Sequence, residues 1–371
     1  MSTTKARPKI LVAPLNWGLG HATRCIPVIK ELINQDAKVI LASDGRSYEL
    51  LRSEFPELKL YRLTPYDVMY SSDSMIFNIA AQLPKILLAI YKEHKSFARI
   101  IQQEKIDGII SDNRFGCYHS SVYSVYITHQ LNIKIPLKPV EMFTRMVNRK
   151  IIDRYDECWI PDYAGKDNIS GELSKPEKIK NAKFIGTLSR FEARTLPKKY
   201  DILAILSGPE PQRSNFEKLV LEQLKELPLK CAVVQGKTEV VERISDGNLD
   251  IFSHCSVPTL NDLIASSDVV IARSGYSTIM DLIQMKKRAL LIPTPGQTEQ
   301  EYLAEKLQKR AWFMSQEQKN LDVAKAIEQI PEFDADLFEK YKDDNILSET
   351  ISAFLKNCEI KNKKLIKKIK T

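Results

Sequence analysis

Short aliphatic runs alternate with longer amphipathic segments along most of this chain. Aliphatic runs separated by amphipathic segments are typical of buried parallel strands that are connected through helices. In the first half of the chain the pattern predicts helices that include Ala22–Asn34 and the long Ser74–Glu104. It predicts strands at Lys9–Pro14, Lys38–Ser43, Leu58–Leu63, Ile106–Ser111, Ser124–Thr128, Glu157–Ile160 and Lys183–Ile185.

The same rhythm restarts near residue 200. Predicted strands follow at Asp201–Leu206, Lys230–Gln235, Leu249–Phe252, Asp268–Ala272 and Arg288–Ile292. Predicted helices lie near Arg213–Glu226, Leu260–Ser266, Thr278–Gln284 and Glu299–Gln308. The polar stretch Ser189–Lys199 has the weakest periodicity and is predicted to be a linker.

A chain of 371 residues is long enough for two domains. We therefore predict an α/β fold of two Rossmann-like, doubly wound domains that face each other across a cleft. The predicted N-terminal domain covers residues 1–192 and the C-terminal domain covers residues 200–345. Residues 346–371 are predicted to form an amphipathic helix that fades into a lysine-rich tail.

Positive charge is concentrated at the C-terminal end. The formal net charge is +8, and residues 356–371 hold seven lysines and one glutamate, so the rest of the chain carries only +2. A nucleic-acid-binding protein spreads basic residues and aromatic platforms over a folded face. The pattern therefore argues against nucleic acid as a partner. For Lys361–Lys370 it leaves open contact with an anionic membrane surface or a solvated, disordered tail.

No segment of the sequence is predicted to span a membrane. The polar, basic Met1–Lys9 runs directly into a predicted strand, and the apolar stretch Ile76–Tyr91 is interrupted by two amides, a proline and a lysine. Within that stretch, Ile86–Tyr91 is expected to be core or an acceptor-side apolar patch. The six scattered cysteines indicate a reducing compartment. We expect a cytoplasmic protein, with peripheral contact at the inner face of the membrane left open.

A glycine turn and a histidine follow the first predicted strand. Gly18 and Gly20 allow a tight turn and close approach of a ligand to the backbone at a helix N-terminus. Since Arg24 and Cys25 stand where a dinucleotide fingerprint has its third glycine, and only Asp44 offers an acidic ribose ligand, a dinucleotide site is disfavoured. His21 is a candidate general base or polar anchor. The alternative is a histidine that caps the helix.

A second polar turn, Ser111–Arg114, follows the predicted strand Ile106–Ser111. Asp112 could hold the His21 imidazole in one tautomer and stabilise its protonated form. The alternative is that Asp112 caps the next helix and Arg114 is solvated. His129, after a neighbouring strand, is open to an acceptor contact or to a structural role.

The C-terminal half contains its own turns at strand ends. Ser207, Gly208 and Arg213 offer a hydroxyl, a bare backbone and a guanidinium, which suit a pyrophosphate. The absence of a following Gly-Lys-Ser/Thr argues against a Walker loop, and so against a kinase or ATPase. Ser274 and Gly275 form a second turn before a helix with phosphate-binding character.

Three further side chains complete the C-terminal candidates. Asp281 lies within the first turns of the helix that follows Gly275, where it could accept hydrogen bonds from ribose hydroxyls. Gln300 and Glu301 end the polar loop after the next strand, and their amide and carboxylate could recognise sugar hydroxyls.

These residues resemble a glycosyltransferase of the GT-B fold, most of all the family that contains the peptidoglycan N-acetylglucosaminyltransferase and the monogalactosyldiacylglycerol synthases. The resemblance covers nearly the whole chain and is carried mainly by Ser256–Ala304. It implies a C-terminal helix that returns toward the N-terminal domain. Two departures stand out: the loop before His21 has fewer glycines than the family pattern, and Glu301 replaces an amide with an acid.

The resemblance also implies roles for individual residues. It implies that Pro258, Thr259 and Leu260 border the base and that Asp281 takes the place of the ribose-binding glutamate. It also implies that Gln300 and Glu301 contact the donor sugar. The residues that it places at the donor diphosphate are Ser207, Gly208, Arg213, Ser274 and Gly275. His21 is implied as the base of the acceptor domain.

The sequence thus predicts a glycosyltransferase that moves a hexose or N-acetylhexosamine from a nucleotide sugar to a hydroxyl of a glycolipid, lipid or glycan. Uridine as the base, inversion at the anomeric carbon and the lack of a bound metal follow from the resemblance. No cofactor is expected, because the nucleotide sugar is a substrate. A nucleotide-sugar epimerase and a non-catalytic nucleotide-sugar-binding protein remain as alternatives, and an oxidoreductase is disfavoured by the missing dinucleotide fingerprint.

Overall fold

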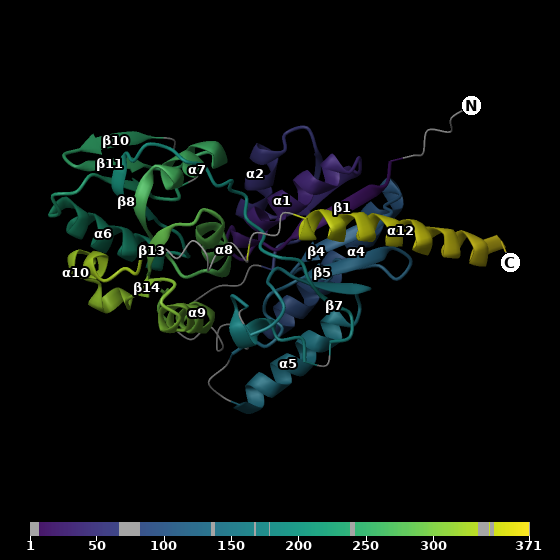
Figure 1. Cartoon of the computed structure of the whole chain (residues 1–371). Helices are drawn as coiled ribbons and strands as arrows, with labels where there is room; N and C mark the ends of the chain where they lie inside the picture. The colour runs from purple at the N-terminus through teal and green to yellow at the C-terminus, as the bar shows by residue number, and fades with distance from the viewer. Residues whose placement is uncertain are drawn as a thin grey trace. The chain divides into compact units, whose positions relative to one another are not determined.

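The structure is a computed structural model that describes residues 7–66, 82–134, 138–166, 168–177, 179–237, 242–332, 341 and 345–370. The chain divides into two compact units (Figure 1). The N-terminal unit comprises Met1–Leu188 together with Asp343–Thr371, and the C-terminal unit comprises Ser189–Lys342. The stretch predicted as a linker, Ser189–Lys199, is therefore part of the C-terminal unit.

The N-terminal unit is built on a seven-stranded parallel sheet in the order β3-β2-β1-β4-β5-β6-β7. Its strands are β1 (Lys9–Pro14), β2 (Lys38–Ser43), β3 (Lys59–Arg62), β4 (Gly108–Asp112), β5 (Tyr123–Ile127), β6 (Glu157–Ile160) and β7 (Ala182–Phe184). Its helices are α1 (Gly20–Asn34), α2 (Gly45–Glu54), α4 (Leu83–Glu104) and α5 (Lys138–Ile152), with a 3-10 turn, η1 (Gly171–Ser174). The predicted strands are confirmed to within two residues. The predicted start of the long helix at Ser74 lies outside the described residues.

Aliphatic content explains why the central strands form. Ile10, Leu11 and Val12 of β1 are fully buried, as are Ile109 and Ile110 of β4. A central parallel strand is covered by helices on both faces, so it needs a continuous aliphatic run rather than an alternating one. This is the run that the hydrophobic pattern marked at both places.

The strand order places a topological switch point between β1 and β4. From β1 the chain continues to β2 and β3 on one side, and it then crosses to β4 on the other side. Pro14 at the end of β1 pairs with Asp112 at the end of β4. Ligands of doubly wound sheets bind outside the carboxyl ends of the strands at such a point. The turn that holds Gly18, Gly20 and His21 follows directly.

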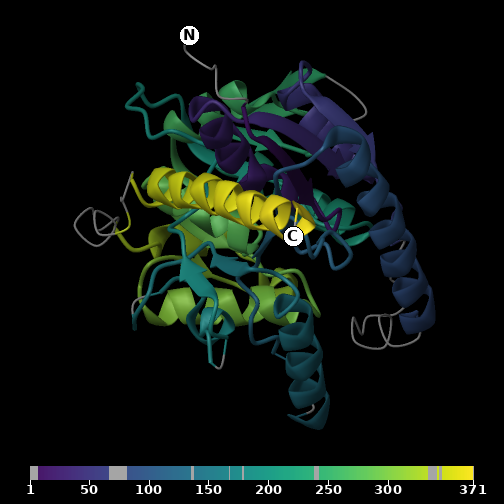
Figure 2. The same cartoon turned by 90° about the vertical axis from the view of Figure 1, so that its right-hand side faces the viewer.

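The C-terminal helix α12 (Ile346–Lys370) belongs to the N-terminal unit and contacts α1 and β5. Figures 1 and 2 both show α12 alongside α1. Phe354 and Cys358 are buried, and a Cβ added at Gly108 of β4 would lie 2.5 Å from the Cys358 Sγ. The Lys361 Nζ donates to Asp156 at 2.9 Å. The end of the chain is therefore helical to Lys370, and not the disordered tail that the sequence left open.

The C-terminal unit holds a second seven-stranded sheet, in the order β10-β11-β9-β8-β12-β13-β14. Its strands are β8 (Tyr200–Ile205), β9 (Cys231–Val234), β10 (Arg243–Asp246), β11 (Leu249–Phe252), β12 (Ser267–Ala272), β13 (Arg288–Leu291) and β14 (Met314–Ser315). Its helices are α6 (Gln212–Lys225), α7 (Val257–Ala265), α8 (Tyr276–Gln284), α9 (Thr298–Lys309) and α10 (Val323–Glu328), with a 3-10 turn, η2 (Gln318–Asn320). Among the described strands of this sheet, β10 alone runs antiparallel to its neighbour, β11.

The five strands predicted in this half are confirmed, and two others were not predicted. All four residues of β10 are exposed, and β14 has only two residues. Neither segment contains the buried aliphatic run on which the prediction depends. The switch point of this sheet lies between β8 and β12, which are neighbours although β9, β10 and β11 come between them in the sequence.

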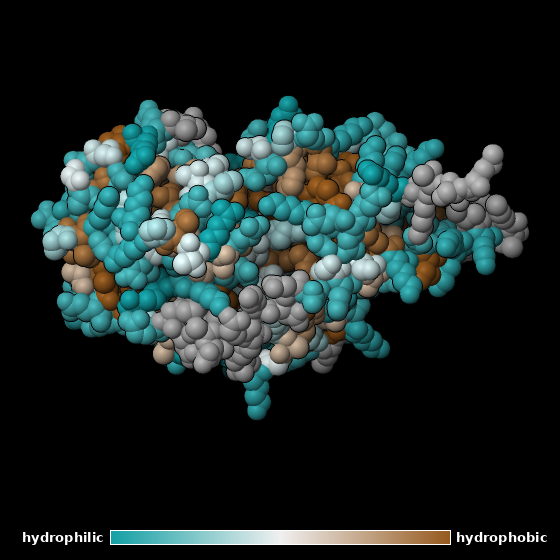
Figure 3. All heavy atoms as spheres, turned by 45° about the horizontal axis from the view of Figure 1, so that its top comes forward, coloured by the Kyte–Doolittle hydropathy of each residue, from teal (hydrophilic) through white to brown (hydrophobic). Residues whose placement is uncertain are grey.

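On the face drawn in Figure 3 hydrophilic residues predominate, and apolar residues gather in smaller areas between them. Across the described ranges, no helix combines the length and apolarity needed to cross a bilayer.

Candidate functional site

The predicted pair of the N-terminal unit is in contact. His21 is the second residue of α1 and Asp112 is the last residue of β4, so both lie at the switch point. The His21 Nδ1 donates to Asp112 Oδ1 at 2.8 Å. Nearby, Gly18 has a φ of 77°, and a Cβ added there would meet no atom within 4 Å. The turn before His21 is therefore open, and the histidine is oriented by a buried carboxylate.

Asp112 has a second partner that the sequence reasoning missed. The Arg24 Nε donates to Asp112 Oδ2 at 2.5 Å, and the Arg24 Nη2 donates to Asp112 Oδ1. The Arg24 Nη1 lies 2.9 Å from the Nδ1 of His129. Since Arg24 follows His21 by three residues on a helix, its position on the same face was the available signal. The result is a chain of contacts from His21 through Asp112 and Arg24 to His129.

The charges of this cluster are balanced. Burial alone would raise the pKa of Asp112, but Arg24 and His21 hold it at about 2. Burial lowers the pKa of His21 below its ordinary value, and Arg24 adds to this effect, while Asp112 opposes it. His21 is therefore neutral at pH 7, with the proton on Nδ1. Its Nε2 keeps a lone pair, and no other hydrogen bond of this side chain is found among the described residues.

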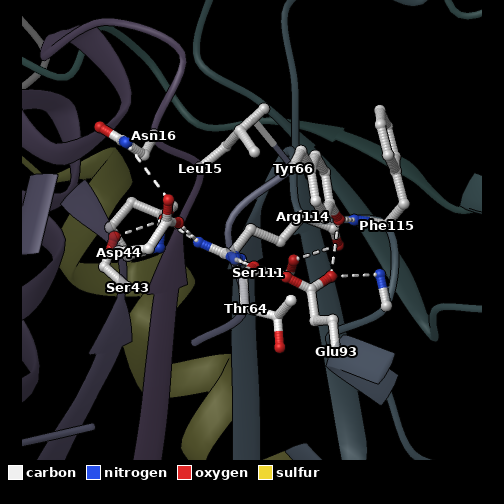
Figure 4. Close-up of polar contacts among 12 residues, drawn as sticks. Leu15, Asn16, Ser43, Asp44, Thr64, Tyr66, Glu93, Ser111, Arg114 and Phe115 are labelled. Atoms are coloured by element: carbon white, nitrogen blue, oxygen red, sulfur yellow. Dashed lines mark hydrogen bonds and ion pairs between the residues drawn. The ribbon is translucent and has the colours of Figure 1, made fainter. Parts of the chain in front are cut away.

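A second buried ion-pair network lies at the same edge of the sheet (Figure 4). Arg114 is completely buried; its Nε donates to Glu93 Oε1 at 2.5 Å, and its Nη1 donates to Asp44. Its Nη2 also donates to the Thr64 carbonyl at 3.1 Å. The alternative that Arg114 is solvated is therefore wrong. Asp44 is occupied by Arg114, which argues against the ribose role that the sequence left open for it.

This network connects the loops around the His21 turn. The Asn16 Nδ2 donates to Asp44 Oδ2 at 3.2 Å, directly before the glycines of that turn. On the other side, Glu93 Oε2 accepts from the Tyr66 hydroxyl at 2.6 Å and from the Gly116 amide at 2.9 Å. Figure 4 shows these side chains converging around Arg114 from separate segments, with Glu93 supplied by α4. The network thus fixes the backbone on which the His21 site is built.

In the C-terminal unit, two of the predicted glycines expose backbone at the switch point. Gly208 follows β8 and has a φ of 119°, and the nearest atom to a Cβ added there is Thr294 Oγ1 at 3.9 Å. Gly275 is the N-cap of α8, with no side-chain cap, and the nearest atom to its added Cβ is Thr278 Oγ1 at 4.0 Å. Ser207, beside Gly208, is exposed. A helix N-terminus with open backbone and no capping side chain suits an anion.

The predicted sugar-binding residues hold the loop after β13. The Ser274 Oγ donates to the Gln300 carbonyl at 2.9 Å. Gln300 Oε1 accepts from the Thr294 amide at 2.9 Å, and Glu301 Oε1 accepts from the Gly296 amide at 3.0 Å. In the structure these three side chains brace the loop, and their contact with a donor sugar or phosphate stays a prediction.

Two arginines of this unit differ from expectation. Arg213 was predicted near the donor pyrophosphate, but its Nε donates to Glu210 at 2.6 Å and its Nη1 to Glu217 at 2.5 Å. Two carboxylates therefore already neutralise its charge, which argues against that prediction. Arg273, not predicted, is 1% exposed and donates to the Pro293 carbonyl at 3.2 Å. Burial lowers its pKa to about 10, and no described carboxylate forms an ion pair with it.

The remaining candidates lie on the helices that flank β12. The Asp281 Oδ1 of α8 accepts from the Ser189 hydroxyl at 2.6 Å, and burial raises the pKa of Asp281 to about 6. Leu260 of α7 is buried, with 7% of its surface exposed. No hydrogen bond joins Asp281 to the loop residues Gln300 and Glu301. The ribose role of Asp281 and the base contact of Leu260 therefore stay predictions.

Comparison with known proteins agrees with this geometry. Residues 212–356 match the glycosyltransferase family 28 C-terminal domain. An uncharacterised glycosyltransferase of Methanosarcina acetivorans is 24% identical over 321 residues, which cover 79% of this chain and 81% of that protein. One of Methanopyrus kandleri is 23% identical over 321 residues, 81% of this chain and 90% of that protein. The chain is a glycosyltransferase.

Solved structures give the fold of this glycosyltransferase. The crystal structure of the glycosyltransferase SnogD from Streptomyces nogalater superposes with a TM-score of 0.66 at 12% identity, over 95% of this chain and 100% of that one. The crystal structure of Acinetobacter baumannii MurG superposes with a TM-score of 0.56 at 12% identity, over 94% and 100%. The fold is GT-B, as the sequence predicted.

Proposed function

We propose that the glycosyltransferase moves a hexose or N-acetylhexosamine from a uridine diphosphate sugar to a hydroxyl of a lipid, glycolipid or glycan. The observation that carries the proposal is the hydrogen bond between His21 and Asp112 at the switch point of the N-terminal unit. A neutral imidazole held at Nδ1 by a carboxylate presents Nε2 as a general base.

In the proposed step, His21 Nε2 takes the proton of the acceptor hydroxyl. The acceptor oxygen forms a bond to the anomeric carbon as the bond to the diphosphate oxygen breaks. The proton stays on the imidazole, and the electron pair of the broken bond leaves with the nucleoside diphosphate. Attack from the face opposite the leaving group inverts the anomeric carbon.

The departing diphosphate is assigned to the C-terminal unit. The N-terminus of α8, whose N-cap Gly275 has no side-chain cap, and the open backbone at Gly208 suit its charge. The buried Arg273 adds a positive charge that no described carboxylate cancels. Two proteins of the same fold support a pyrimidine nucleotide: VinC was solved with dTDP and Arabidopsis thaliana UGT89C1 with UDP-L-rhamnose. The proposal therefore gives stabilisation of the leaving group to protein groups rather than to a metal ion.

An amphiphilic acceptor is supported by apolar side chains on two helices. In a doubly wound sheet the helices begin at the carboxyl edge of the strands, where His21 lies. Ile86 is buried, but other apolar residues in the first half of α4 are exposed, and so are apolar residues of α5. Figure 2 shows both helices extending beyond the sheet. The exposed apolar residues are Leu83, Leu87, Leu88, Tyr91, Met142, Phe143, Met146 and Val147. Exposed basic residues beside them are Lys85, Lys92, Lys95, Lys138, Arg149 and Lys150. We assign peripheral membrane contact to these two helices.

A thermal-shift series tests the donor assignment. UDP, dTDP, ADP and NAD are compared at equal concentrations with the full chain. A ligand that binds only the folded state at a hundred times its Kd adds about 2.7 kcal/mol to the free energy of unfolding. We expect UDP to raise the Tm, dTDP to raise it less, and ADP and NAD to leave it unchanged. A rise with NAD and none with UDP would contradict the proposal.

A further inference from the structure

We propose that Arg24 holds Asp112 in a closed ion pair, so that Asp112 orients the His21 imidazole without drawing a second proton onto it. Arg24 is then a positioning residue, which acts on the acceptor hydroxyl only through His21. The inference rests on the proposed role of His21 as the base.

The contact geometry gives Asp112 a full positive partner. Arg24 is 2% exposed and Asp112 is completely buried. Two nitrogens of the guanidinium face the two carboxylate oxygens, a fork that fixes the carboxylate plane. Oδ1 of that carboxylate also accepts from His21 Nδ1 at 2.8 Å. Asp112 therefore orients the imidazole with an oxygen whose charge Arg24 already balances.

The other end of the guanidinium fixes a second histidine. The Arg24 Nη1 lies 2.9 Å from His129 Nδ1, and a guanidinium can only donate. His129 Nδ1 is therefore the acceptor in this contact. Arg24 thus makes Nδ1 of His129 an acceptor, whereas Asp112 holds the proton of His21 on Nδ1.

The remaining group in the cluster adds no charge. The Cys25 Sγ lies 3.6 Å from Asp112 Oδ2, and burial raises the pKa of the Cys25 thiol well above its ordinary value. Among the described residues, the groups that face His21 are then one carboxylate, one guanidinium, the His129 imidazole and one neutral thiol. The charges of the carboxylate and the guanidinium cancel. A lone carboxylate in this place would instead favour the imidazolium, which cannot act as a base.

The structure thus separates two effects that a buried carboxylate ordinarily has on a histidine. The hydrogen bond to Nδ1 selects the tautomer and the ring orientation. The negative charge promotes protonation, and Arg24 cancels it. A base arranged in this way stays deprotonated in slightly acidic solution.

The direct test is the NMR titration of His21 in the full chain. The sequence has five histidines, so ¹³C-labelled imidazole signals are few, and the signal lost in His21→Asn identifies His21. We compare the wild type with Arg24→Met, with Arg24→Lys, and with Lys30→Met as a control. Lys30 is exposed on the same helix, so Lys30→Met removes one positive charge without changing the cluster around Asp112.

We expect the His21 pKa in Arg24→Met to rise by about one to three pH units, the effect of an uncancelled carboxylate at hydrogen-bond distance. Arg24→Lys should give a smaller rise, because the charge remains but the fork is lost. Lys30→Met should leave the titration unchanged. A His21 pKa in folded Arg24→Met that equals or falls below the wild-type value would overturn the proposal.

If Arg24→Met does not fold, the same comparison is made in a protein that already carries Asp112→Asn. Asp112→Asn is compared with Asp112→Asn/Arg24→Met, where no buried carboxylate is left unpaired. The proposal expects the His21 pKa to be higher in the double variant than in the single variant. Equal values would overturn it.

The rate profile separates this inference from the proposed function. If His21 is the base, the acid limb of kcat/KM should move with the His21 pKa in Arg24→Met. If the His21 pKa moves while the acid limb of the kcat/KM profile stays in place, the role of Arg24 is confirmed and the role of His21 as the base is contradicted. If both the His21 pKa and the acid limb stay unchanged, the role of Arg24 is overturned.

Discussion

The two units treat charge at their switch points in opposite ways. In the N-terminal unit, each buried arginine beside the site is matched by carboxylates: Arg24 by Asp112, and Arg114 by Glu93 and Asp44. What is left over is a neutral imidazole. Such a site suits a neutral hydroxyl that must lose a proton.

In the C-terminal unit Arg213 is matched by carboxylates. The buried Arg273 has hydrogen bonds to carbonyls and an amide, and none to a carboxylate in the part of the chain that the structure describes. Open backbone at Gly208 and Gly275 adds amide dipoles. Such a site suits an anion that must be held. The proposed function assigns the acceptor chemistry to the first sheet and the leaving-group chemistry to the second, and this difference supports that assignment.

The largest effect is expected from Arg114→Met. The substitution leaves Glu93 and Asp44 buried without their partner, so we expect the free energy of unfolding to fall by about 3–5 kcal/mol. Denaturant unfolding measures it. Arg62→Met, which breaks the exposed pair with Glu49 at 3.0 Å, is the control and should change stability by about 0–1 kcal/mol. Equal losses in the two variants would show that the buried network does not stabilise this unit.

Gly275→Val should separate donor binding from folding. The φ of Gly275 is −68°, and its added Cβ meets no atom closer than 4.0 Å, so the free protein accommodates a Cβ without a close contact. The new side chain adds bulk at the N-cap of α8, next to its first turn. We expect UDP affinity to fall about 10–200-fold, the range for a small misfit in a binding site. Isothermal titration measures the affinity, and the Tm without nucleotide should change little. Unchanged UDP affinity would place the diphosphate elsewhere.

Arg273→Gln and Arg213→Gln form a matched pair. Loss of the unmatched charge of Arg273 should weaken UDP binding about tenfold, which corresponds to roughly 1.4 kcal/mol. Loss of the matched Arg213 should have a smaller effect, because Glu210 and Glu217 already offset its charge at the ligand. Titration of both variants with UDP and with uncharged uridine isolates the charge effect. The reverse order would restore the original prediction for Arg213.

The smallest effect concerns the pH dependence of stability at Asp281. Burial raises the pKa of Asp281 to about 6 in the folded protein, above its ordinary value of 3.8. The folded state therefore holds this proton more tightly, and the associated stability is full below pH 3.8 and is lost as the pH rises through 6. Asp281→Asn should raise the Tm by a few degrees at pH 8 relative to pH 5. A Tm difference that does not depend on pH would contradict the raised pKa.

Much of the fold could be predicted because parallel strands carry their own signal. The aliphatic runs of β1, β4, β8 and β12 identify the centres of both sheets, and the strand ends identify the turns with His21 and Asp112. β10 could not be predicted, because its residues are exposed and it depends on pairing with β11 rather than on burial.

Site residues were harder to predict where their ion-pair partner lies far away in the sequence. Arg24 lies 88 residues from Asp112, and an arginine on an amphipathic helix is usually taken as solvated. The ion pairs of Arg213 could have been predicted. Glu210 stands three residues before it and Glu217 four residues after it, which is the spacing of helical ion pairs. Arg273 gave no signal, since its burial arises from packing among segments that are far apart in the sequence.

Acceptor-dependent release of UDP from UDP-sugars, in the wild type and in His21→Ala, tests the central claim most directly. UDP-hexoses and UDP-N-acetylhexosamines are offered with lipid, glycolipid and glycan alcohols, and the released UDP is quantified. We expect release that requires an acceptor and that falls about 10²–10⁴-fold in His21→Ala, the range for loss of a general base, while UDP affinity is unchanged. Release at the wild-type rate in His21→Ala would contradict the account.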